Sequence, residues 1–365
     1  MKQQQFIITE QDERAEMTGC HSPRTLPPFH APRLLLIILA CVSILSLSAG
    51  RYAGDFMMIG AGVRPLGMGG AFSALADDGS AIFWNASGIA GITEREVAAM
   101  HAFLYGGLAS YDNLSYIQPL PNGVSIGLNL TRLTVSDIPY FSESYLIGTN
   151  VDQRINNSAY HLPGVPDSEF DSTDDLYQFA FAKHFRYDAN MGWLFFEIPF
   201  DFYLGGNVKF IKRKLRTNYG TGTGVDLSFK ITTDMGVIFD VEELGKLDFA
   251  MNFQDVAGTD IAWDTVNKIK DEVLFNTKLG LAIRQPIPPL KSELKLAYDY
   301  DYVYEGTSHY GVEWDYNNKG SLRAGYYDKN ISLGASVKIY DVNLDYALVT
   351  NPVGVTNRLG LRLRF

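Results

Sequence analysis

The chain has 365 residues, enough for two ordinary domains or for one large sheet-built domain. Its 31 lysines and arginines against 41 aspartates and glutamates give a formal net charge of −10. Binding to a nucleic-acid backbone needs a positive surface, so an acidic chain of this kind is not expected to have a nucleic-acid partner.

Residues 1–50 are predicted to be a secretory signal with an N-terminal extension. From Arg33 the sequence reads "RLLLIILACVSILSLSAG", a positive flank and an apolar run that ends in small residues before Gly50. The run is shorter than the ~20 residues that a helix needs to span a bilayer. Cleavage near Gly50 would remove both cysteines, Cys20 and Cys41, so the exported chain is expected to contain no disulfide or thiolate site.

From about Glu96 onward, strict alternation of apolar and polar residues predicts β-strands. In "ISLGASVKI", for example, Leu333 and Val337 fall on one face, and Ser332 and Lys338 fall on the other. The strands are expected at 96–104, 111–119, 123–134, 175–185, 200–216, 223–240, 246–256, 273–285, 292–304, 309–317, 320–328, 331–340, 341–349 and 355–365.

Alternation alone would also fit a soluble β-sandwich. Strands of about ten residues, charges of both signs on the polar faces, and Tyr and Trp near strand ends favour a transmembrane barrel instead. The two longest connections, 135–174 and 257–272, also fall on the same side of such a barrel. The sequence therefore predicts an all-β fold, a transmembrane antiparallel β-barrel of about 14 strands over residues 94–365.

The C-terminal strand carries a specific pattern. "RLGLRLRF" places Leu359, Leu361, Leu363 and the terminal Phe365 on one face. Edges of soluble sheets seldom end on an unguarded aromatic residue. The pattern resembles the signal that the outer-membrane assembly machinery recognises, so we expect these four residues to form the barrel assembly signal. The expected location is the bacterial outer membrane, with its lipid, its lipopolysaccharide and the barrel-assembly machinery as partners.

The stretch "GMGGAFSALADDGSAIFWNASGIA", residues 67–90, lies between the signal and the first strand. Gly67, Gly69 and Gly70 permit close backbone approaches, and Asp77 or Asp78 can accept hydrogen bonds from the backbone amides that follow. Small residues around one large aromatic, Trp84, suit a compact plug. We therefore expect residues 51–93 to form a hatch inside the lumen.

Residues 60–92, "GAGVRPLGMGGAFSALADDGSAIFWNASGIAGI", resemble the FadL/TodX-like outer-membrane family, in particular its branch related to PorV and PorQ. That branch carries a stretch like "GARALGMGGAFVAVADDASAAYWNPAGLA", and its NPA triplet corresponds here to Asn85-Ala86-Ser87, without the proline. The resemblance implies a fourteen-stranded barrel with a hatch that passes hydrophobic molecules such as long-chain fatty acids. It places the hatch and substrate path at Gly67, Gly69, Gly70, Asp77, Asp78, Trp84, Asn85 and Gly88.

Other candidate chemistry is weaker. His101, His161, His184 and His309 show no close spacing, so no metal site is expected. "DSEFDSTDD", residues 167–175, could bind calcium but fits a solvated acidic loop better. "KFIKRKLR", residues 209–216, could meet lipopolysaccharide phosphates or be a solvated strand extension.

Two functional classes therefore remain. The first is an outer-membrane channel of the FadL-like type for hydrophobic small molecules, gated by the hatch. The alternative, implied by relatives in the PorV branch, is an outer-membrane component of a protein secretion or surface-assembly system. No motif of a hydrolase is present, so neither an enzyme activity nor a cofactor is expected.

Overall fold

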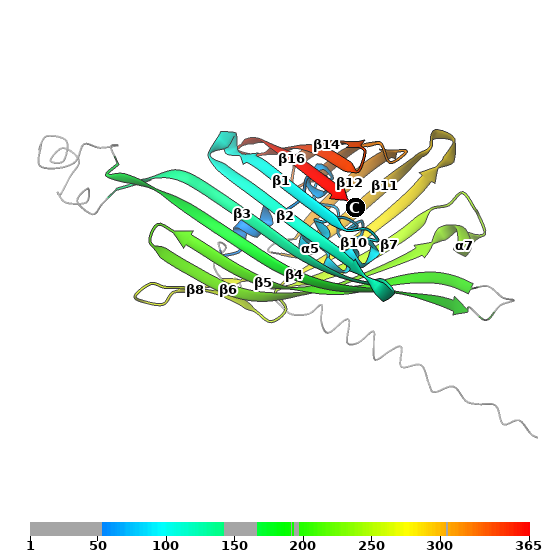
Figure 1. The fold of residues 1–365 in the computed structure, drawn as a ribbon, viewed down its shortest axis with the longest axis horizontal. Helices are drawn as coiled ribbons and strands as arrows, with labels where there is room; N and C mark the ends of the chain where they lie inside the picture. The colour runs from blue at the N-terminus through cyan, green and yellow to red at the C-terminus, as the bar shows by residue number, and fades with distance from the viewer. Residues whose placement is uncertain (1–52, 142–165, 191, 193–196, 304–305) are drawn as a thin grey trace, which may run out of the picture. The chain divides into compact units, whose positions relative to one another are not determined.

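The chain folds as a closed β-barrel, seen in a computed structural model that describes residues 53–141, 166–190, 192, 197–303 and 306–365. Within these ranges, fourteen antiparallel strands pair edge to edge around the wall (Figure 1). The first and last strands close the ring, with pairs from Glu96↔Arg364 to Phe103↔Asn357. The predicted fourteen-stranded antiparallel barrel is confirmed.

The wall strands follow one another in chain order. They are β1 (Glu96–Leu104), β2 (Ala109–Leu120), β3 (Val124–Tyr140), β4 (Ser168–Asn190), β5 (Glu197–Leu215), β6 (Asn218–Asp234), β7 (Lys246–Gln254), β10 (Asn276–Ile287), β11 (Ser292–Asp301), β12 (Thr307–Tyr316), β13 (Gly320–Tyr327), β14 (Asn330–Ile339), β15 (Val342–Asn351) and β16 (Gly354–Arg364). A hairpin of β8 (Thr259–Trp263) and β9 (Lys270–Val273) is inserted between β7 and β10.

Short helices lie before the barrel and at its connections. Those before β1 are α3 (Asp55–Met58), α4 (Val63–Gly67), α5 (Ala81–Trp84) and η1 (Ala86–Gly91). Those at connections are η2 (Tyr105–Gly107), η3 (Pro121–Gly123), α7 (Met235–Phe239) and η5 (Pro288–Leu290). In the described part of the chain, no helix has the length and apolar character needed to cross a membrane.

The two faces of the wall differ in chemistry, because neighbouring residues of a strand point to opposite sides. In β14, Leu333 is 53% exposed on the outside, whereas Ser332 is fully buried and donates a hydrogen bond to Gly67 O in the lumen. The same outer row of exposed apolar residues continues around the barrel, including Leu128, Phe179, Phe210, Leu227, Leu281, Leu296 and Leu359. An apolar outer face with a polar inner face is typical of barrels in a bilayer.

The strand expected over 223–240 ends earlier, at Asp234. The Asp234 carboxylate accepts a hydrogen bond of 2.9 Å from the Gly236 amide and so caps α7. Apolar residues continue past this point, but the cap turns the backbone into a helix. The alternation pattern therefore extended the strand too far.

The long connection expected at 257–272 contains the β8–β9 hairpin. β8 pairs with the end of β6 at Gly220↔Trp263 and Thr221↔Ala262. A Cβ atom at Gly220 would come within 3.0 Å of the side chains of Ile261 and Trp263. Glycine at this position therefore lets the hairpin lie close to β6.

The acidic run at 167–175 is also corrected, because it belongs largely to β4 and is not a solvated loop. Asp174 accepts a hydrogen bond of 2.8 Å from Arg213 Nε on the inner face. Asp175, on the opposite face of the strand, pairs with Arg132, with 2.6 Å between Oδ1 and Nε. Two of the acids in this run are therefore paired with arginines on neighbouring strands.

Two names describe the ends of the barrel. We call the end at which β1 finishes and β2 begins the loop end; β3 also passes to β4 there. The opposite end, at which β2 passes to β3 through η3, is the turn end.

Candidate functional site

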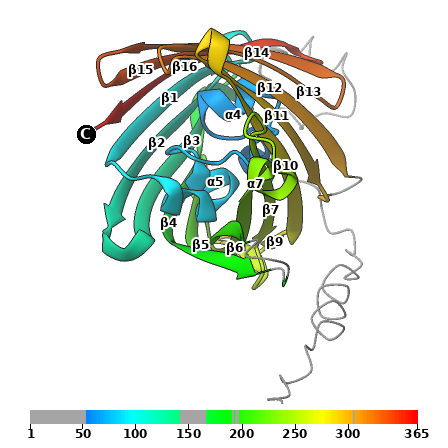
Figure 2. The same cartoon turned by 90° about the vertical axis from the view of Figure 1, so that its right-hand side faces the viewer.

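The chain that precedes β1 lies inside the barrel. Figure 2 looks along the barrel and shows α4 and α5 surrounded by the wall strands. We call residues 53–95 the luminal segment. Its apolar residues, among them Phe72, Leu75, Ile82 and Ile89, are buried with side chains of the wall in one core.

Glycines on both partners let the luminal segment lie directly against the wall. Gly69, with φ +66°, approaches Gly325 of β13 so closely that a Cβ added to Gly325 would lie 2.1 Å from Gly69 N. Gly67 faces Gly334 of β14 in the same way, at 3.2 Å from Cβ to Cα. Other wall glycines that receive the segment are Gly127, Gly205, Gly280, Gly311 and Gly360.

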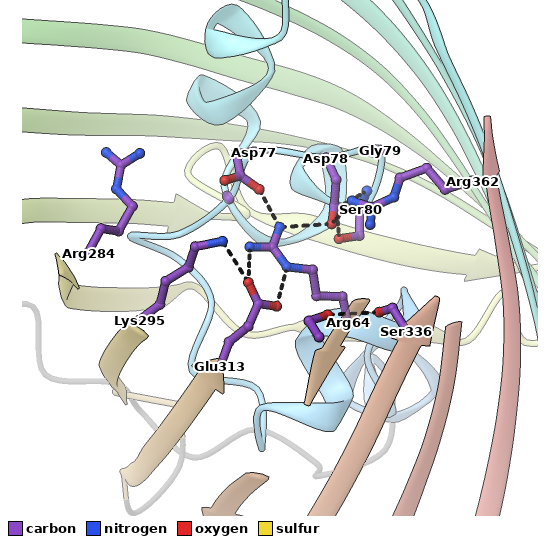
Figure 3. A network of polar contacts seen from close by, with 12 residues as sticks. Arg64, Asp77, Asp78, Gly79, Ser80, Arg284, Lys295, Glu313, Ser336 and Arg362 are labelled. Carbon is purple, nitrogen blue, oxygen red and sulfur yellow. Dashed lines mark hydrogen bonds and ion pairs between the residues drawn. The ribbon is translucent and has the colours of Figure 1, made fainter. Parts of the chain in front are cut away.

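Arg64 of α4 is the centre of an ion network that ties the segment to the wall. Figure 3 shows its guanidinium between Asp77, Asp78 and Glu313 of β12. The Nε and Nη2 atoms of Arg64 donate to the two Glu313 oxygens at 2.7 and 2.9 Å. Glu313 also accepts hydrogen bonds from Lys295 at 2.8 Å and from Arg323 at 2.6 Å. Arg64 is only 6% exposed, so this pairing takes place away from bulk water.

Two arginines of the last strand extend the network. Arg362 pairs with Asp78, with 3.1 Å between Nη1 and Oδ2. Arg364 donates to Glu96 at 2.6 Å, and Glu96 in turn accepts a hydrogen bond from the Gly79 amide. The polar face of β16 therefore holds the luminal segment, while its apolar face points outward.

Two acids of the luminal segment, Asp77 and Asp78, are held in their charged form. Partial burial alone would raise the pKa of Asp77, but the Arg64 guanidinium, with Lys295 and Lys230, outweighs it and lowers the pKa. Burial would likewise raise the pKa of Asp78, and the charges of Arg362 and Arg64 hold it below its usual value. Asp77 and Asp78 are therefore charged at neutral pH.

These shifts predict that mild acid leaves the ion pairs of Asp77 and Asp78 with Arg64 in place. A carboxylate with a lowered native pKa contributes stability above its unfolded pKa, about 3.9, and this is lost only as the pH falls below that value. Between pH 7 and pH 5, wild type and Asp77→Asn should therefore show the same pH dependence of single-channel conductance, because Asp77 keeps its charge throughout this range. An opening transition in this range that Asp77→Asn abolishes would contradict the predicted role of the Asp77 ion pair.

The structure places the remaining predicted hatch residues in the core of the segment. Trp84 is buried, and its Nε1 donates to Ala61 O at 2.6 Å. Asn85 donates to Ser73 O at 2.9 Å and accepts from the Ser87 amide, so its shorter bonds stay within the segment. Gly70 lies against His309, and a Cβ at Gly88 would collide with Ala76 O.

The predicted assembly residues lie on the outside of the barrel. Leu359, Leu361 and Phe365 are 44–59% exposed. The Phe365 amide and carbonyl pair with those of Arg95, which fixes the end of the chain beside the start of β1.

The lumen is divided by the segment into two spaces of different chemistry. Towards the loop end lies a cavity that we call the loop-end chamber. Its apolar lining includes Met57, Met58, Phe83, Leu176, Val273 and Leu274, and its polar lining includes Gln178, Lys209, Asp226, Gln254, Asp255 and Asn276. Towards the turn end lies a strongly charged vestibule, lined among others by Lys230, Arg284, Lys295, Arg323, Lys338 and Arg364.

The sequence did not single out every important residue. Arg64 lies within residues 60–92, the stretch that resembles the FadL/TodX-like family, but its main partner, Glu313, lies 249 positions away. The basic run 209–216 was expected either to meet lipopolysaccharide phosphates or to be a solvated strand extension, and neither holds for two of its members. Lys209 and Arg213 point into the lumen, where they pair with Asp255 and Asp174.

Comparison with known proteins finds barrels of low identity. The Ralstonia pickettii toluene transporter TbuX is 12% identical over 84% of this chain and 98% of that chain, with a TM-score of 0.46. The Pseudomonas putida toluene transporter TodX is 12% identical over 83% and 96%, with a TM-score of 0.45. A Pseudomonas aeruginosa FadL homologue is 11% identical over 83% and 97%, with a TM-score of 0.42. No family model and no curated protein sequence matches the chain. The function is therefore argued from the site itself.

Proposed function

We propose that the protein is an outer-membrane channel for hydrophobic small molecules, in which residues 51–93 act as a hatch. The observation that carries this proposal is the loop-end chamber. Met57 and Phe83 of the luminal segment face Leu176 and Val273 of the barrel there, so an apolar solute would contact the hatch itself. A concave, partly apolar space with a few polar groups is the usual form of a small-molecule site.

The charged vestibule suits a hatch that opens only transiently. Its lining carries many full charges, so an apolar solute gains nothing by staying there. Arg64 and Glu313 lie on the vestibule side of the hatch, and Trp84 lies in its core. In the proposed cycle, a solute bound in the chamber weakens the packing of the hatch, and the ion network restores the closed state.

The chamber predicts that one added charge stops uptake. Met57→Glu places a carboxylate in the apolar lining, and desolvating it costs several kcal/mol. Cells that make the protein should take up a hydrophobic fluorescent probe faster than cells without it, and Met57→Glu should reduce this gain about tenfold or more. Val266→Glu is the control, because Val266 is fully exposed and lines no chamber. Equal uptake by wild type and Met57→Glu would count against the channel.

The apolar outer face predicts a strong penalty for charge facing lipid. Leu333 lies near the middle of the ten-residue strand β14. Leu333→Arg should therefore lower the free energy of unfolding in bilayers by about 2–4 kcal/mol. Asn343→Arg is the control, because Asn343 lines the open vestibule. Ser332 would be a poor control, since it is buried against the hatch. Equal unfolding free energies for the two arginine variants, measured in urea, would argue against a lipid-facing wall.

Export and assembly belong to the same proposal. Residues 1–50, which lie outside the described residues, would direct secretion. Leu359, Leu361, Leu363 and Phe365 would be recognised by the assembly machinery. Exposed basic residues on β5, such as Lys212 and Lys214, would face the lipopolysaccharide leaflet.

The close glycine contacts between the hatch and the wall would also suit a hatch that never moves. A fixed hatch would favour the second function, a PorV/PorQ-like secretion or surface-assembly component. A barrel with no hydrophobic uptake and no change of conductance in hatch variants would support that alternative.

A further inference from the structure

One side of the loop-end chamber is built from a buried ion triad. Lys209 Nζ lies 2.8 Å from Asp226 Oδ1 and 2.8 Å from Asp255 Oδ2. Both carboxylate oxygens of Asp255 have a hydrogen-bond partner, because Oδ1 also accepts a hydrogen bond of 2.7 Å from Thr259 Oγ1. All three charged side chains are at least 95% buried, so the triad is a fixed part of the chamber wall.

The same wall carries two acceptor atoms without a donor. Asp226 Oδ1 accepts from Lys209 and from the Asp255 amide, but Asp226 Oδ2 has no hydrogen-bond partner among the described residues. Asn276 donates to Gln254 Oε1 at 3.0 Å, while its own Oδ1 is also without a partner there. Buried polar atoms are normally satisfied, and a buried acceptor left unpaired costs free energy. Both residues line the chamber.

The charges of the chamber also favour a ligand that donates hydrogen bonds over an anionic one. Lys209 is already shared by two aspartates, and Lys278 is paired with Asp301 at 2.7 Å. Neither cation is therefore left to bind an incoming carboxylate. Glu272 adds a further negative charge to the lining. An anionic head group would meet carboxylates here, whereas a donor would meet free acceptors.

We propose that the loop-end chamber selects an amphiphile whose polar end donates hydrogen bonds, an amine or an alcohol, over one that ends in a carboxylate. The apolar body lies against Met57, Phe83 and Leu176, and the polar end donates to Asp226 Oδ2 and Asn276 Oδ1. An ammonium group is bound more tightly than a hydroxyl, because Asp226 is charged. This inference rests on the proposed function and names the substrate class of the same chamber.

Three probes with the same eight-carbon chain test the selectivity: octylamine, octan-1-ol and octanoate. Binding to the full barrel in nanodiscs is measured by equilibrium dialysis, with empty nanodiscs as the blank. Octylamine should bind at least about tenfold more tightly than octanoate, since one charge-assisted hydrogen bond is worth a factor of that order. Octan-1-ol should lie between them.

Asp226→Asn is the decisive variant, and Asp255→Asn is its matched control. Each removes one negative charge from the same triad, but only Asp226 has an oxygen free for a ligand. Asp226→Asn should lower octylamine affinity about tenfold, and Asp255→Asn should lower it much less. Asn276→Ala, which leaves the triad intact, should weaken octan-1-ol binding. Heat-dependent electrophoretic mobility confirms that each variant contains a folded barrel.

The outcomes separate this inference from the proposed function. Octanoate binding as tightly as octylamine, or equal losses in the two aspartate variants, would overturn the selectivity while leaving uptake of the hydrophobic probe unaffected. If none of the three probes binds and cells with the protein take up no hydrophobic probe, the channel itself is wrong. If nanodiscs with the barrel bind no more of any probe than empty nanodiscs do, the inference is likewise overturned.

Discussion

Replacing Arg64 with leucine is expected to release the luminal segment and to raise single-channel conductance strongly. Arg64 is the only segment cation of the described network that contacts Asp77, Asp78 and Glu313 together. Its removal breaks the ion pair of Asp77, whereas Glu313 keeps Lys295 and Arg323, and Asp78 keeps Arg362. Breaking a buried ion pair from one side costs about 3–5 kcal/mol, and the remaining cations and the partly exposed Asp77 place this change near the lower end of that range. Conductance in planar bilayers and protease protection of residues 53–95 would report the release.

The control for Arg64→Leu is Lys270→Ala, which removes a cation from an exposed pair with Asp260. The two side chains are 65% and 54% exposed, and such pairs contribute at most about 1 kcal/mol. Lys270→Ala should therefore leave conductance and protease protection unchanged. A folded Arg64→Leu barrel with the conductance and protection of wild type would show that packing alone holds the segment.

The barrel was predictable from the sequence because strand alternation is a local signal. Leu333 and Ser332 are neighbours in the chain, and their opposite polarity already assigns them to opposite faces of the wall. The terminal strand was predictable for the same reason, with Leu361 outside and Arg362 inside. Alternation fails where a side chain redirects the backbone, as Asp234 does at the start of α7.

The site was harder to predict because its contacts are distant in sequence. Arg64 and Glu313 come from opposite ends of the chain, and neither has a local pattern that names the other. The same is true of Gly69 and Gly325, whose contact requires the barrel to close first. Likewise, "KFIKRKLR" looks uniformly basic, yet strand geometry turns Lys209 inward, where it helps to form the chamber. Residue type was visible in the sequence, whereas the pairing of residues was not.

Gly325→Ala is expected to force the luminal segment away from the wall while the barrel remains folded. The added Cβ would lie 2.1 Å from Gly69 N and 2.2 Å from Met68 C, and these are backbone atoms that cannot rotate away. Overpacking a core by a methyl group usually costs about 1–3 kcal/mol, and a backbone clash of this kind falls at or above the top of that range. Gly69→Ala should act in the same way, since Gly69 has φ +66° and its Cβ would lie 2.7 Å from Tyr326 N. Both variants should show raised conductance and faster proteolysis of residues 53–95. Gly91→Ala provides the control within the segment, because its Cβ would make only an ordinary contact of 3.4 Å with Tyr203. If Gly325→Ala has the same conductance as Gly91→Ala, the segment does not close the lumen, and the proposal that it acts as a hatch is wrong.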